Sequence, residues 1–568
     1  MFYGALFLLS AGLNIVLGLH GWPAVLAGSL TDPDSYMRLL RLQDGIRAGH
    51  LMLTVARDGP GAGVMVEWSR LLDMLLWLMA APLALVLGWH RALFVAGVAL
   101  GPLGVGALGV SLAWVAEPFA ARTHLWSAAV AAALLPGLLT FAAPGVVHYH
   151  ILLLALIAAT VGFVARAWQA ETGHGFMAGL CGGFAIWLTP ETMPFVLMAF
   201  AALLLRWTQV RLGSTLTACA AGFFDVLGFA LVIDPPQGGY GVAEIDRLSY
   251  VYVALGLLLL AGAGALWRLE SRSAGWRVPI GVGLMAALLL GWVALFPRVA
   301  MGPYGLMSST EMKKFFGVML ELQPVRGASL VLYLAPGALA LGFALAKALQ
   351  QRGRWLWLYV ALCLLVALIL GQKFILFVGF STAAAASILP IMLSEMSWRL
   401  QTKPLAAMLG RIAVLIAMLG APELAAQALA TAKPAPNGVI FPSCSLRHIA
   451  PLLAPLGGTT VLAQAEDTPE LLYRTRIEAV GSLYQHGVAG FLRDRAAWRA
   501  IPDKKVPKAV LATGARDILF CPQAARYPAV ADLKHDTLWD ELNSNHPPPW
   551  LKLRGLGAAG WRLYRIIF

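Results

Sequence analysis

Charged residues are scarce in this sequence of 568 residues. Asp, Glu, Lys and Arg make up 12% of the chain, whereas 59% of the residues are hydrophobic and the mean hydropathy is +0.74. A soluble protein of this length does not need so much apolar surface. Apolar runs of roughly 20 residues, the length that crosses a bilayer as a helix, recur along the chain. The composition therefore predicts a polytopic α-helical membrane protein.

The sequence also lacks the signatures of nucleotide-driven machines. It contains no internal repeat, no Walker A motif and no G-x-G-x-x-G turn, so an ATP-driven transporter is disfavoured. No basic, aromatic-interleaved soluble module is visible either, which argues against nucleic acid as a partner. The formal net charge of +13 instead suits contact with anionic membrane lipids and with lipid phosphates.

Only five cysteines are present. Cys181, Cys219 and Cys363 fall in apolar runs, where a free thiol behaves as a small hydrophobic side chain. Cys444 and Cys521 lie in the C-terminal part, and they can form a disulfide if that part is extracytoplasmic. Two separate buried thiols are the alternative, and the sequence leaves both open.

We expect about 13 transmembrane helices. The first begins close to the N-terminus without a basic n-region or a nearby cleavage signal, so we interpret it as a retained span rather than a removed signal peptide. The expected spans cover residues 2–20, 92–116, 125–141, 150–168, 176–189, 194–207, 214–233, 250–267, 278–296, 329–349, 355–370, 374–393 and 409–429.

One further apolar run, residues 71–89, is ambiguous because it contains Asp73. If this run lies on the outer leaflet without crossing, the basic loops all fall on one face, which the positive-inside rule makes cytoplasmic. We therefore prefer that arrangement to a crossing helix. The basic loops contain Arg206 and Arg211; Arg268, Arg272 and Arg277; Lys347, Arg352 and Arg354; and Arg399, Lys403 and Arg411. The opposite, extracytoplasmic face then carries the long loops 25–91 and 297–327, the short turns 147–150 and 371–373, and the C-terminal part.

The composition changes near residue 430. Residues 431–437, TAKPAPN, are typical of a linker. Beyond them, strand-like runs alternate with a helical run at residues 487–500, which indicates a small α/β domain. The strand-like runs are residues 438–442, 459–464, 509–513 and 517–521. We therefore divide the chain into a transmembrane domain, residues 1–430, and an extracytoplasmic domain, residues 431–568.

The stretch at residues 30–44, LTDPDSYMRLLRLQD, is the most charged segment near the first span. Its Asp-Pro pair fixes a turn, after which the chain can wind into a short helix. Asp32 would then sit rigidly at the membrane surface, where a carboxylate can bind a divalent cation or accept a proton. A polar loop that merely ends a hairpin is the alternative.

Three further groups of polar residues fall on the same face. His148 and His150 open a span two residues apart, and on an extended turn both can face one ligand; two interfacial histidines without a ligand are the alternative. The loop at residues 297–327 is long without being of low complexity, which is more often functional than idle. That loop carries Arg298, Lys313 and Glu321. Lys373 lies between two apolar runs, where it can bind a phosphate or simply extend to lipid headgroups.

The order of these groups resembles that of the GT-C glycosyltransferase superfamily. Within it, the chain is most similar to the catalytic subunit of oligosaccharyltransferase and its bacterial and archaeal single-subunit relatives. Asp32-Pro33 through Arg38 resembles the DPxxxxR motif of that family's first external loop, which holds the catalytic Asp. Residues 148–150, His-Tyr-His, stand where the family has a second carboxylate motif.

The later motifs continue the resemblance. Glu321 stands where the family's S/TxxE motif ends, and Lys373 stands where an arginine binds the lipid pyrophosphate. The resemblance also implies 13 spans and an extracytoplasmic C-terminal domain. It covers the whole membrane part and is specific in the order of the motifs rather than in individual residues.

Three departures from the family pattern bear on function. Histidines replace the second carboxylate pair, so a metal site there is less anionic, and softer metals are better tolerated or the metal is lost. Val318 stands where the S/TxxE motif has a hydroxyl. The C-terminal domain has no WWD motif, which the family uses to recognise the Ser or Thr of the glycosylation sequon. A sugar, a lipid or an unusual protein acceptor is thereby favoured over general N-glycosylation.

The resemblance implies an inverting glycosyltransferase of the inner membrane. It would transfer a sugar or oligosaccharide from a polyprenyl-phosphate or polyprenyl-pyrophosphate lipid to an extracytoplasmic glycan, lipid or protein. A lipid-linked-sugar flippase and a non-catalytic member of the same fold are the alternatives. We expect Asp32 and Glu321 to be catalytic, Lys373, Arg298 and Lys313 to bind the donor phosphate, and Asp32, His148 and His150 to hold a divalent metal such as Mg²⁺ or Mn²⁺.

Overall fold

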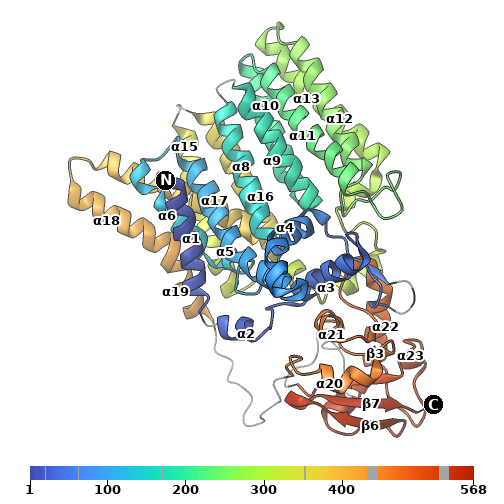
Figure 1. The fold of residues 1–568 in the computed structure, drawn as a ribbon. Coiled ribbons are helices and arrows are strands. Elements are labelled where there is room, and N and C mark those ends of the chain that lie inside the picture. The colour runs from blue at the N-terminus through green and yellow to red at the C-terminus, as the bar shows by residue number, and fades with distance from the viewer. Residues whose placement is uncertain are drawn as a thin grey trace.

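The computed structural model describes residues 1–19, 21–59, 61, 63–168, 171–350, 353–430, 444–523 and 536–567. Figure 1 shows long helices side by side, with a small domain containing a sheet below one end of the bundle. The predicted linker at residues 431–437, the strand-like run at residues 438–442, His20 and Arg352 lie outside the described residues.

Eleven helices in the described part of the chain are long and apolar enough to cross a membrane. They are α4 (Arg70–Leu87), α5 (Trp89–Ala116), α8 (His150–Ala167), α10 with the preceding turn (Pro190–Gln209), α11 (Gly213–Ile233), α12 (Tyr250–Arg268), α13 (Ala274–Leu295), α15 (Ala328–Leu349), α16 (Arg354–Lys373), α17 with the preceding turn (Ile375–Arg399), and α18 with α19 (Pro404–Leu429). Ten of them correspond to predicted spans, and α4 is the run for which we expected no crossing.

The other three predicted spans are shorter or interrupted helices. The first is α1 (Phe2–Leu17), and the run at residues 176–189 is α9 (Thr172–Leu188). The run at residues 125–141 divides into α6 (Trp126–Leu134) and α7 (Pro136–Leu139). The division falls at Pro136, which has no N–H to continue the α6 hydrogen-bond ladder and holds the preceding residue in an extended conformation.

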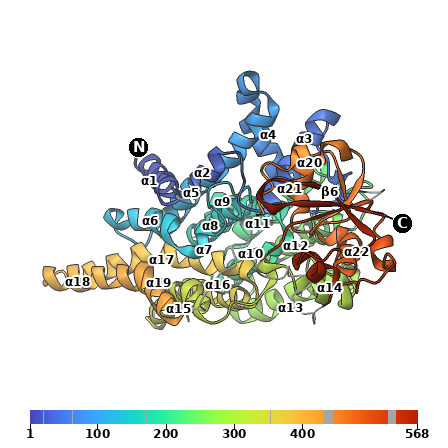
Figure 2. The ribbon, with the colours of Figure 1, turned by 90° about the horizontal axis from the view of Figure 1, so that it is seen from below.

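Both ends of α4 lie on the side of the C-terminal domain. At its start, the Arg70 backbone N–H donates to Asp234 at 2.8 Å, in the loop whose Asp246 is bound by His486 of the C-terminal domain. Just beyond its end, the ring of His90 stacks on Tyr473 of that domain. Figure 2, a view from below, shows α4 extending sideways out of the bundle. These contacts place both ends of α4 near the C-terminal domain, while its length and apolar composition also suit a crossing helix. Its position along the membrane surface therefore stays a prediction.

The C-terminal domain is built on a five-stranded sheet in the order β4-β3-β5-β7-β6. Its strands β3, β4 and β5 are parallel, whereas β5, β7 and β6 are antiparallel. The strands are β3 (Thr460–Leu462), β4 (Glu478–Ala479), β5 (Asp517–Phe520), β6 (Leu551–Leu556) and β7 (Arg562–Ile566). The fold class predicted from the sequence, a polytopic helical membrane protein followed by a small α/β domain, is confirmed.

Two predictions for this domain have opposite outcomes. Cys444 and Cys521 form a disulfide, which resolves the alternative that the sequence left open. The strand expected at residues 509–513 is wrong, because the short helix α23 (Lys508–Leu511) and a turn occupy this segment. Pro507 directly precedes that helix, a place where proline fits a helix start, and Ala and Leu favour helix over strand.

The C-terminal domain contacts the first external loop through hydrogen bonds of Arg57, from both its side chain and its backbone. The Arg57 guanidinium donates to the carbonyls of Leu472 at 2.7 Å and Thr475 at 2.8 Å, and the Arg57 carbonyl accepts from the Ala479 N–H at 2.9 Å. The helix α21 (Thr468–Arg474) packs against α3 (Pro33–Ala48). This interface fixes the position of the domain relative to the Asp32 loop.

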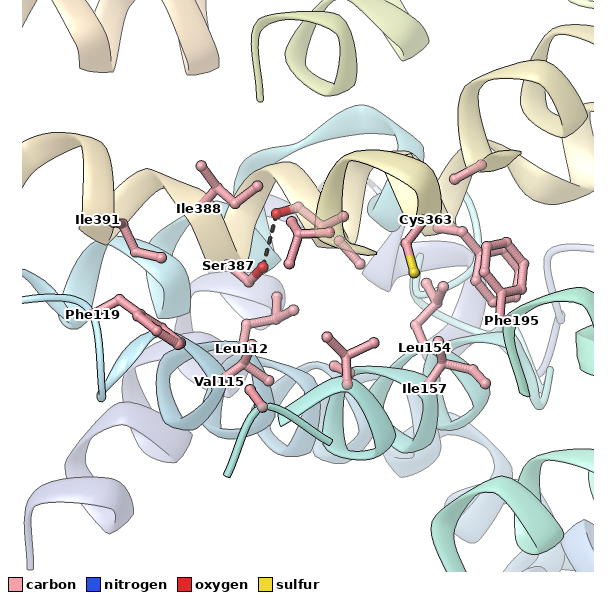
Figure 3. Close-up of a pocket in the computed structure, with 18 of the residues that line it drawn as sticks. Leu112, Val115, Phe119, Leu154, Ile157, Phe195, Cys363, Ser387, Ile388 and Ile391 are labelled. Carbon is pink, nitrogen blue, oxygen red and sulfur yellow. Dashed lines mark hydrogen bonds between the residues drawn. The ribbon is translucent and has the colours of Figure 1, made fainter. Parts of the chain in front are cut away.

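A largely apolar cavity lies inside the bundle (Figure 3). Residues of α5, α8, α16 and α17 line most of it, among them Leu112, Leu154, Cys363 and Ile388. The Ser387 hydroxyl, the polar group drawn there, donates to the Ala384 carbonyl of its own helix at 2.8 Å. No charged side chain is among the described residues that line this cavity, so it offers no group for acid–base chemistry.

Candidate active site

Asp32 is the N-cap of α3. Its carboxylate accepts hydrogen bonds from the Ser35 N–H at 2.9 Å and from the Ser35 hydroxyl at 2.8 Å. Pro33 follows at the first helical position, where its fixed φ suits the helix and its missing N–H costs nothing. The turn and helix predicted from the Asp-Pro pair are thus present, and the helix is longer than expected.

The histidine turn lies directly against this cap. The Val147 N–H donates to the Ser35 hydroxyl at 2.7 Å, which holds the turn to the first turn of α3. His148 Nε2 is 2.9 Å from Asp32 Oδ1, and its Nδ1 is 3.4 Å from the Nδ1 of His150. The His150 ring is buried and stacks on Phe141 with ring centres 4.4 Å apart. The buried His150 ring therefore contacts the side of the His148 ring that faces away from Asp32.

Asp34 and Glu321 complete the group on the other side of His148. One ligand atom from each of Asp34, His148 and Glu321 lies within 4.8 Å of the other two. Asp34 also accepts a hydrogen bond of 2.8 Å from the Tyr484 hydroxyl of the C-terminal domain. Asp34, Glu321 and Tyr484 all line one cleft, whereas Asp32 and the two histidines are not among its lining residues.

The loop that carries Glu321 is held at this site by the turn before α17. The Val325 N–H donates to the Gln372 carbonyl at 3.0 Å, and the Ile375 N–H donates to the Gln323 carbonyl at 3.0 Å. These two bonds place the 3-10 helix η4 (Leu320–Leu322) over the cleft. The Asp32 loop, the histidine turn and the Glu321 loop, which are predicted to share one face, are thus brought together in space, and the segment around Lys373 adjoins them.

The charges in the site depend on burial and on the Asp32–His148 contact. Burial opposes ionisation of Asp32, but attraction to His148 and hydrogen bonds from His148 and Ser35 outweigh it and lower the pKa of Asp32. Burial also opposes the charge on His148, but Asp32 outweighs it and raises the pKa of His148 to about 9. His148 is therefore an imidazolium at neutral pH, and it can donate to both Asp32 and His150.

The two carboxyls that line the cleft behave differently. Burial raises the pKa of Glu321 to about 7 and also raises the pKa of Asp34. A carboxylate with a pKa near neutrality is a better proton acceptor than an ordinary one. Asp34 and Glu321 therefore have the position and the basicity that acid–base chemistry requires.

The same residues fit a divalent metal ion. Metal–ligand distances of about 2.0–2.2 Å put two ligands of one ion about 4 Å apart, and the 4.8 Å spread of Asp34, His148 and Glu321 needs only a small adjustment. Two carboxylates and an imidazole suit a divalent cation of the first transition row. His148 must lose a proton to act as a ligand. The set differs from the predicted one, because Asp34 and Glu321 take the places expected for Asp32 and His150.

An apolar groove of about 430 Å³ adjoins the cleft. Four residues line both spaces: Glu191, Pro303, Tyr304 and Leu376. The Tyr304 hydroxyl donates to Glu191 at 3.3 Å at this junction. The remaining wall is almost entirely apolar and comes from the turns and helices near the membrane surface, including Trp292, Phe316 and Phe377.

The predicted phosphate-binding residues lie at the edge of this groove. Lys373, Arg298 and Lys313 are all exposed, and none of them lines the cleft or the groove. Their sequence neighbours Phe374, Val299 and Met312 do line the groove. The three cations are therefore near the groove but outside the carboxylate cluster, and their roles remain predictions.

Several residues of the cleft had no role predicted from the sequence. Tyr484 and Gln485 come from the C-terminal domain, about 450 positions from Asp34, and Glu67, Glu191 and Asp246 come from three other segments. Each is a single polar residue without a motif around it. Asp246 is buried and Glu67 is partly buried, and the sequence shows neither.

The helical bundle, the external loops and the C-terminal sheet domain together define a membrane protein with the fold of the GT-C oligosaccharyltransferases. Among the solved structures that it resembles are those of the archaeal oligosaccharyltransferase AglB from Archaeoglobus fulgidus. The complex of AglB with an inhibitory peptide and a dolichol-phosphate matches with a TM-score of 0.66 and 10% identity, over 91% of this chain and 69% of that one.

Two further structures of the same archaeal enzyme show the same likeness. The complex with Zn and sulfate matches with a TM-score of 0.66 and 11% identity, over 90% of this chain and 67% of that one. The form tethered to an acceptor peptide with the NVT sequon matches with a TM-score of 0.64 and 12% identity, over 91% and 69%. No family model and no curated protein matches the chain. The resemblance seen in the sequence is thus confirmed at the level of the fold.

Proposed function

We propose that this protein is a membrane glycosyltransferase. It transfers a sugar or oligosaccharide from a polyprenyl-phosphate-type lipid to an acceptor on the extracytoplasmic side of the inner membrane. The observation that carries the proposal is the junction of a cleft containing Asp34 and Glu321 with an apolar groove at the membrane surface. The dolichol-phosphate and the acceptor peptide bound by the archaeal enzyme of the same fold support it.

The groove suits the lipid part of the donor. Its apolar wall can take the first isoprene units, while the headgroup extends toward Glu191 and Tyr304 at the junction with the cleft. Negative charge grows on the phosphate as it leaves the sugar, and cations that stabilise this charge accelerate transfer. Lys373, Arg298 and Lys313 are the cations at the edge of the groove, and we assign this role to them.

The cleft suits activation of the acceptor. We assign Asp34 and Glu321 as the catalytic carboxylates, because they line the cleft, and Asp32 as a positioning residue that acts through His148. The acceptor atom attacks the anomeric carbon as the bond from that carbon to the phosphate oxygen breaks. The acceptor proton passes to a carboxylate, and the phosphate leaves with the bonding electrons. A single displacement of this kind inverts the anomeric carbon.

Asp34, His148 and Glu321 would hold a divalent ion, and Mn²⁺ or Mg²⁺ is the first to test. When bound, the ion supplies positive charge beside the leaving phosphate. The residues of the chain perform the remaining tasks: Ser35 and Asp32 orient His148, and Tyr484 orients Asp34. The acceptor is a glycan, a lipid or a protein, and the missing WWD motif favours the first two.

The test uses the purified full-length protein in detergent, where there is no membrane to cross. A polyprenyl-pyrophosphate-linked fluorescent sugar is supplied with extracts of surface glycan, lipid and protein as acceptors. We expect a labelled product of inverted anomeric configuration, read by mass spectrometry and NMR. A protein that binds the donor but forms no product with any acceptor would support a flippase or a non-catalytic role and would refute the proposal.

A further inference from the structure

A second polar cavity lies where the C-terminal domain meets the corner between α4 and α5. Its volume is about 530 Å³, and it shares no lining residue with the cleft or the apolar groove. Four segments form it: the end of α2 (Trp22–Leu26), the α4–α5 corner, and two stretches of the C-terminal domain. The cavity is therefore a separate feature of the interface between the two parts of the chain.

The charged groups in this cavity are all basic. Arg91 from α5 and Arg447 from the C-terminal domain are exposed, and no ion pair is found for either among the described residues. Arg474 lies beside them and is paired with Glu470 at 2.5 Å. His90 and His448 also line the cavity, and no carboxylate does.

Guanidinium groups with this arrangement are suited to phosphate. Arg presents several N–H donors in a planar fork that matches phosphate oxygens. Arg91 and Arg447 belong to different parts of the chain, and like charges brought together across an interface repel each other unless an anion lies between them. A phosphate in the cavity would convert this repulsion into attraction and would strengthen the interface.

The lining of the cavity also contains apolar side chains that are open to the outside. Leu26 is 82% exposed, Leu87 is 40% exposed and Val95 is 42% exposed, and all three line the cavity. They stand next to α4, which has most of its length unburied and extends out of the bundle (Figure 2). With α4 along the membrane surface, as the distribution of basic loops predicts, the basic groups lie at the level of the lipid headgroups.

We propose that this cavity binds an anionic phospholipid of the outer leaflet. The phosphate lies between Arg91 and Arg447, and the acyl chains lie against Leu26, Leu87 and Val95. The lipid then joins the C-terminal domain to the α4–α5 corner, as part of the interface that α21 and α3 also form. This site does not depend on the proposed glycosyl transfer.

The experiment measures lipid retention by native mass spectrometry of the full-length protein. Phosphatidylglycerol and phosphatidylcholine are offered together in mixed micelles. Each basic residue near an anionic surface strengthens binding about fivefold, so two arginines predict a preference for phosphatidylglycerol of about thirtyfold. The R91Q/R447Q variant should lose this preference. The R268Q/R272Q variant removes the same charge from exposed positions on the opposite face and should keep it.

Equal retention of the two lipids by the native protein would overturn the proposal, and so would a preference that the R91Q/R447Q variant keeps. In a further arm with the native protein, glycerol phosphate, which has the headgroup phosphate without acyl chains, is added in large excess. The lipid should stay bound. Complete displacement would show a site for a soluble phosphate compound and would also overturn the proposal.

Discussion

Glu321 is the residue whose ionisation matters most near neutral pH. Burial raises its pKa to about 7, so at neutrality about half of the molecules carry the ionised form that can accept a proton. Without a bound metal ion, which would keep Glu321 ionised at lower pH, glycosyl transfer should therefore rise with pH and level off above about pH 7. The E321Q variant should lose this rise and should be slower by roughly a hundredfold or more, the usual contribution of a proton acceptor.

The measurement is the initial rate of transfer between about pH 5 and about pH 9, the span over which the Glu321 carboxyl changes charge. The D44N variant serves as the control, because Asp44 lies on α3 like Asp34 but pairs with the exposed Arg47 on the surface. Its pH profile should match that of the native protein. An unchanged rise in E321Q would show that another group is the proton acceptor.

At the same scale, the sequence predicted which segments lie together, but it did not predict which of their carboxylates line the cleft. The Asp-Pro pair correctly placed Asp32 at a helix start, and the histidine pair correctly fell beside it. The chain could not show that the Asp32 carboxylate is already occupied by Ser35 and His148, whereas Asp34 two residues later lines the cleft. That distinction depends on side-chain direction in a tertiary contact.

At the scale of elements, Asp73 connects the first two helices of the external loop. Its carboxylate accepts from Arg38 at 3.0 Å and from Arg41 at 2.5 Å, and all three side chains are buried. Replacing it in the D73A variant leaves two buried guanidinium groups without a counter-ion. Breaking a buried pair in this way costs about 3–5 kcal/mol.

The expected result is a large fall in the thermal stability of the D73A variant and a loss of activity, because α3 carries Asp32 and Asp34. The matched control is D44A, which removes an exposed ion pair of the same helix and should cost about 1 kcal/mol or less. Unfolding of both variants is followed in detergent. Equal stability of D73A and D44A would contradict this role of Asp73.

Elements were predictable where hydrophobic length alone decides them. Ten spans follow from runs of apolar residues. The position of residues 71–89 at the membrane surface, which rests on the distribution of basic loops, stays a prediction. Prediction failed where a local breaker or a short segment decides, as at Pro136 and at residues 509–513. Such segments are too short for a periodic pattern to distinguish strand from helix.

At the scale of the whole molecule, the disulfide between Cys444 and Cys521 holds the C-terminal domain together. It joins residues 77 positions apart, and closing a loop of that length stabilises a domain by about 4 kcal/mol. The C444S/C521S variant should therefore unfold at a lower temperature, and a reductant should lower the unfolding temperature of the native protein. The C181S variant lacks a free cysteine instead and should still respond to the reductant. No response in the native protein would contradict the disulfide.

The assembly of the site from both ends of the chain could not be predicted from sequence. Tyr484 binds Asp34 across 450 positions, and Arg57 binds the carbonyls of α21 and the segment that follows it. Neither contact has a local pattern, and each exists because the C-terminal domain folds back onto the first external loop. The sequence predicted that both parts lie on one face, and the structure shows how they meet.

The most direct test of the account is the rate of sugar transfer from a polyprenyl-pyrophosphate donor by the native protein and the D34N variant, measured side by side in detergent. The D44N variant is the control. The account predicts product from the native protein and from D44N, and a rate at least about a hundredfold lower from D34N at the same melting temperature. Equal rates from D34N and the native protein would contradict the assignment of the cleft as the active site.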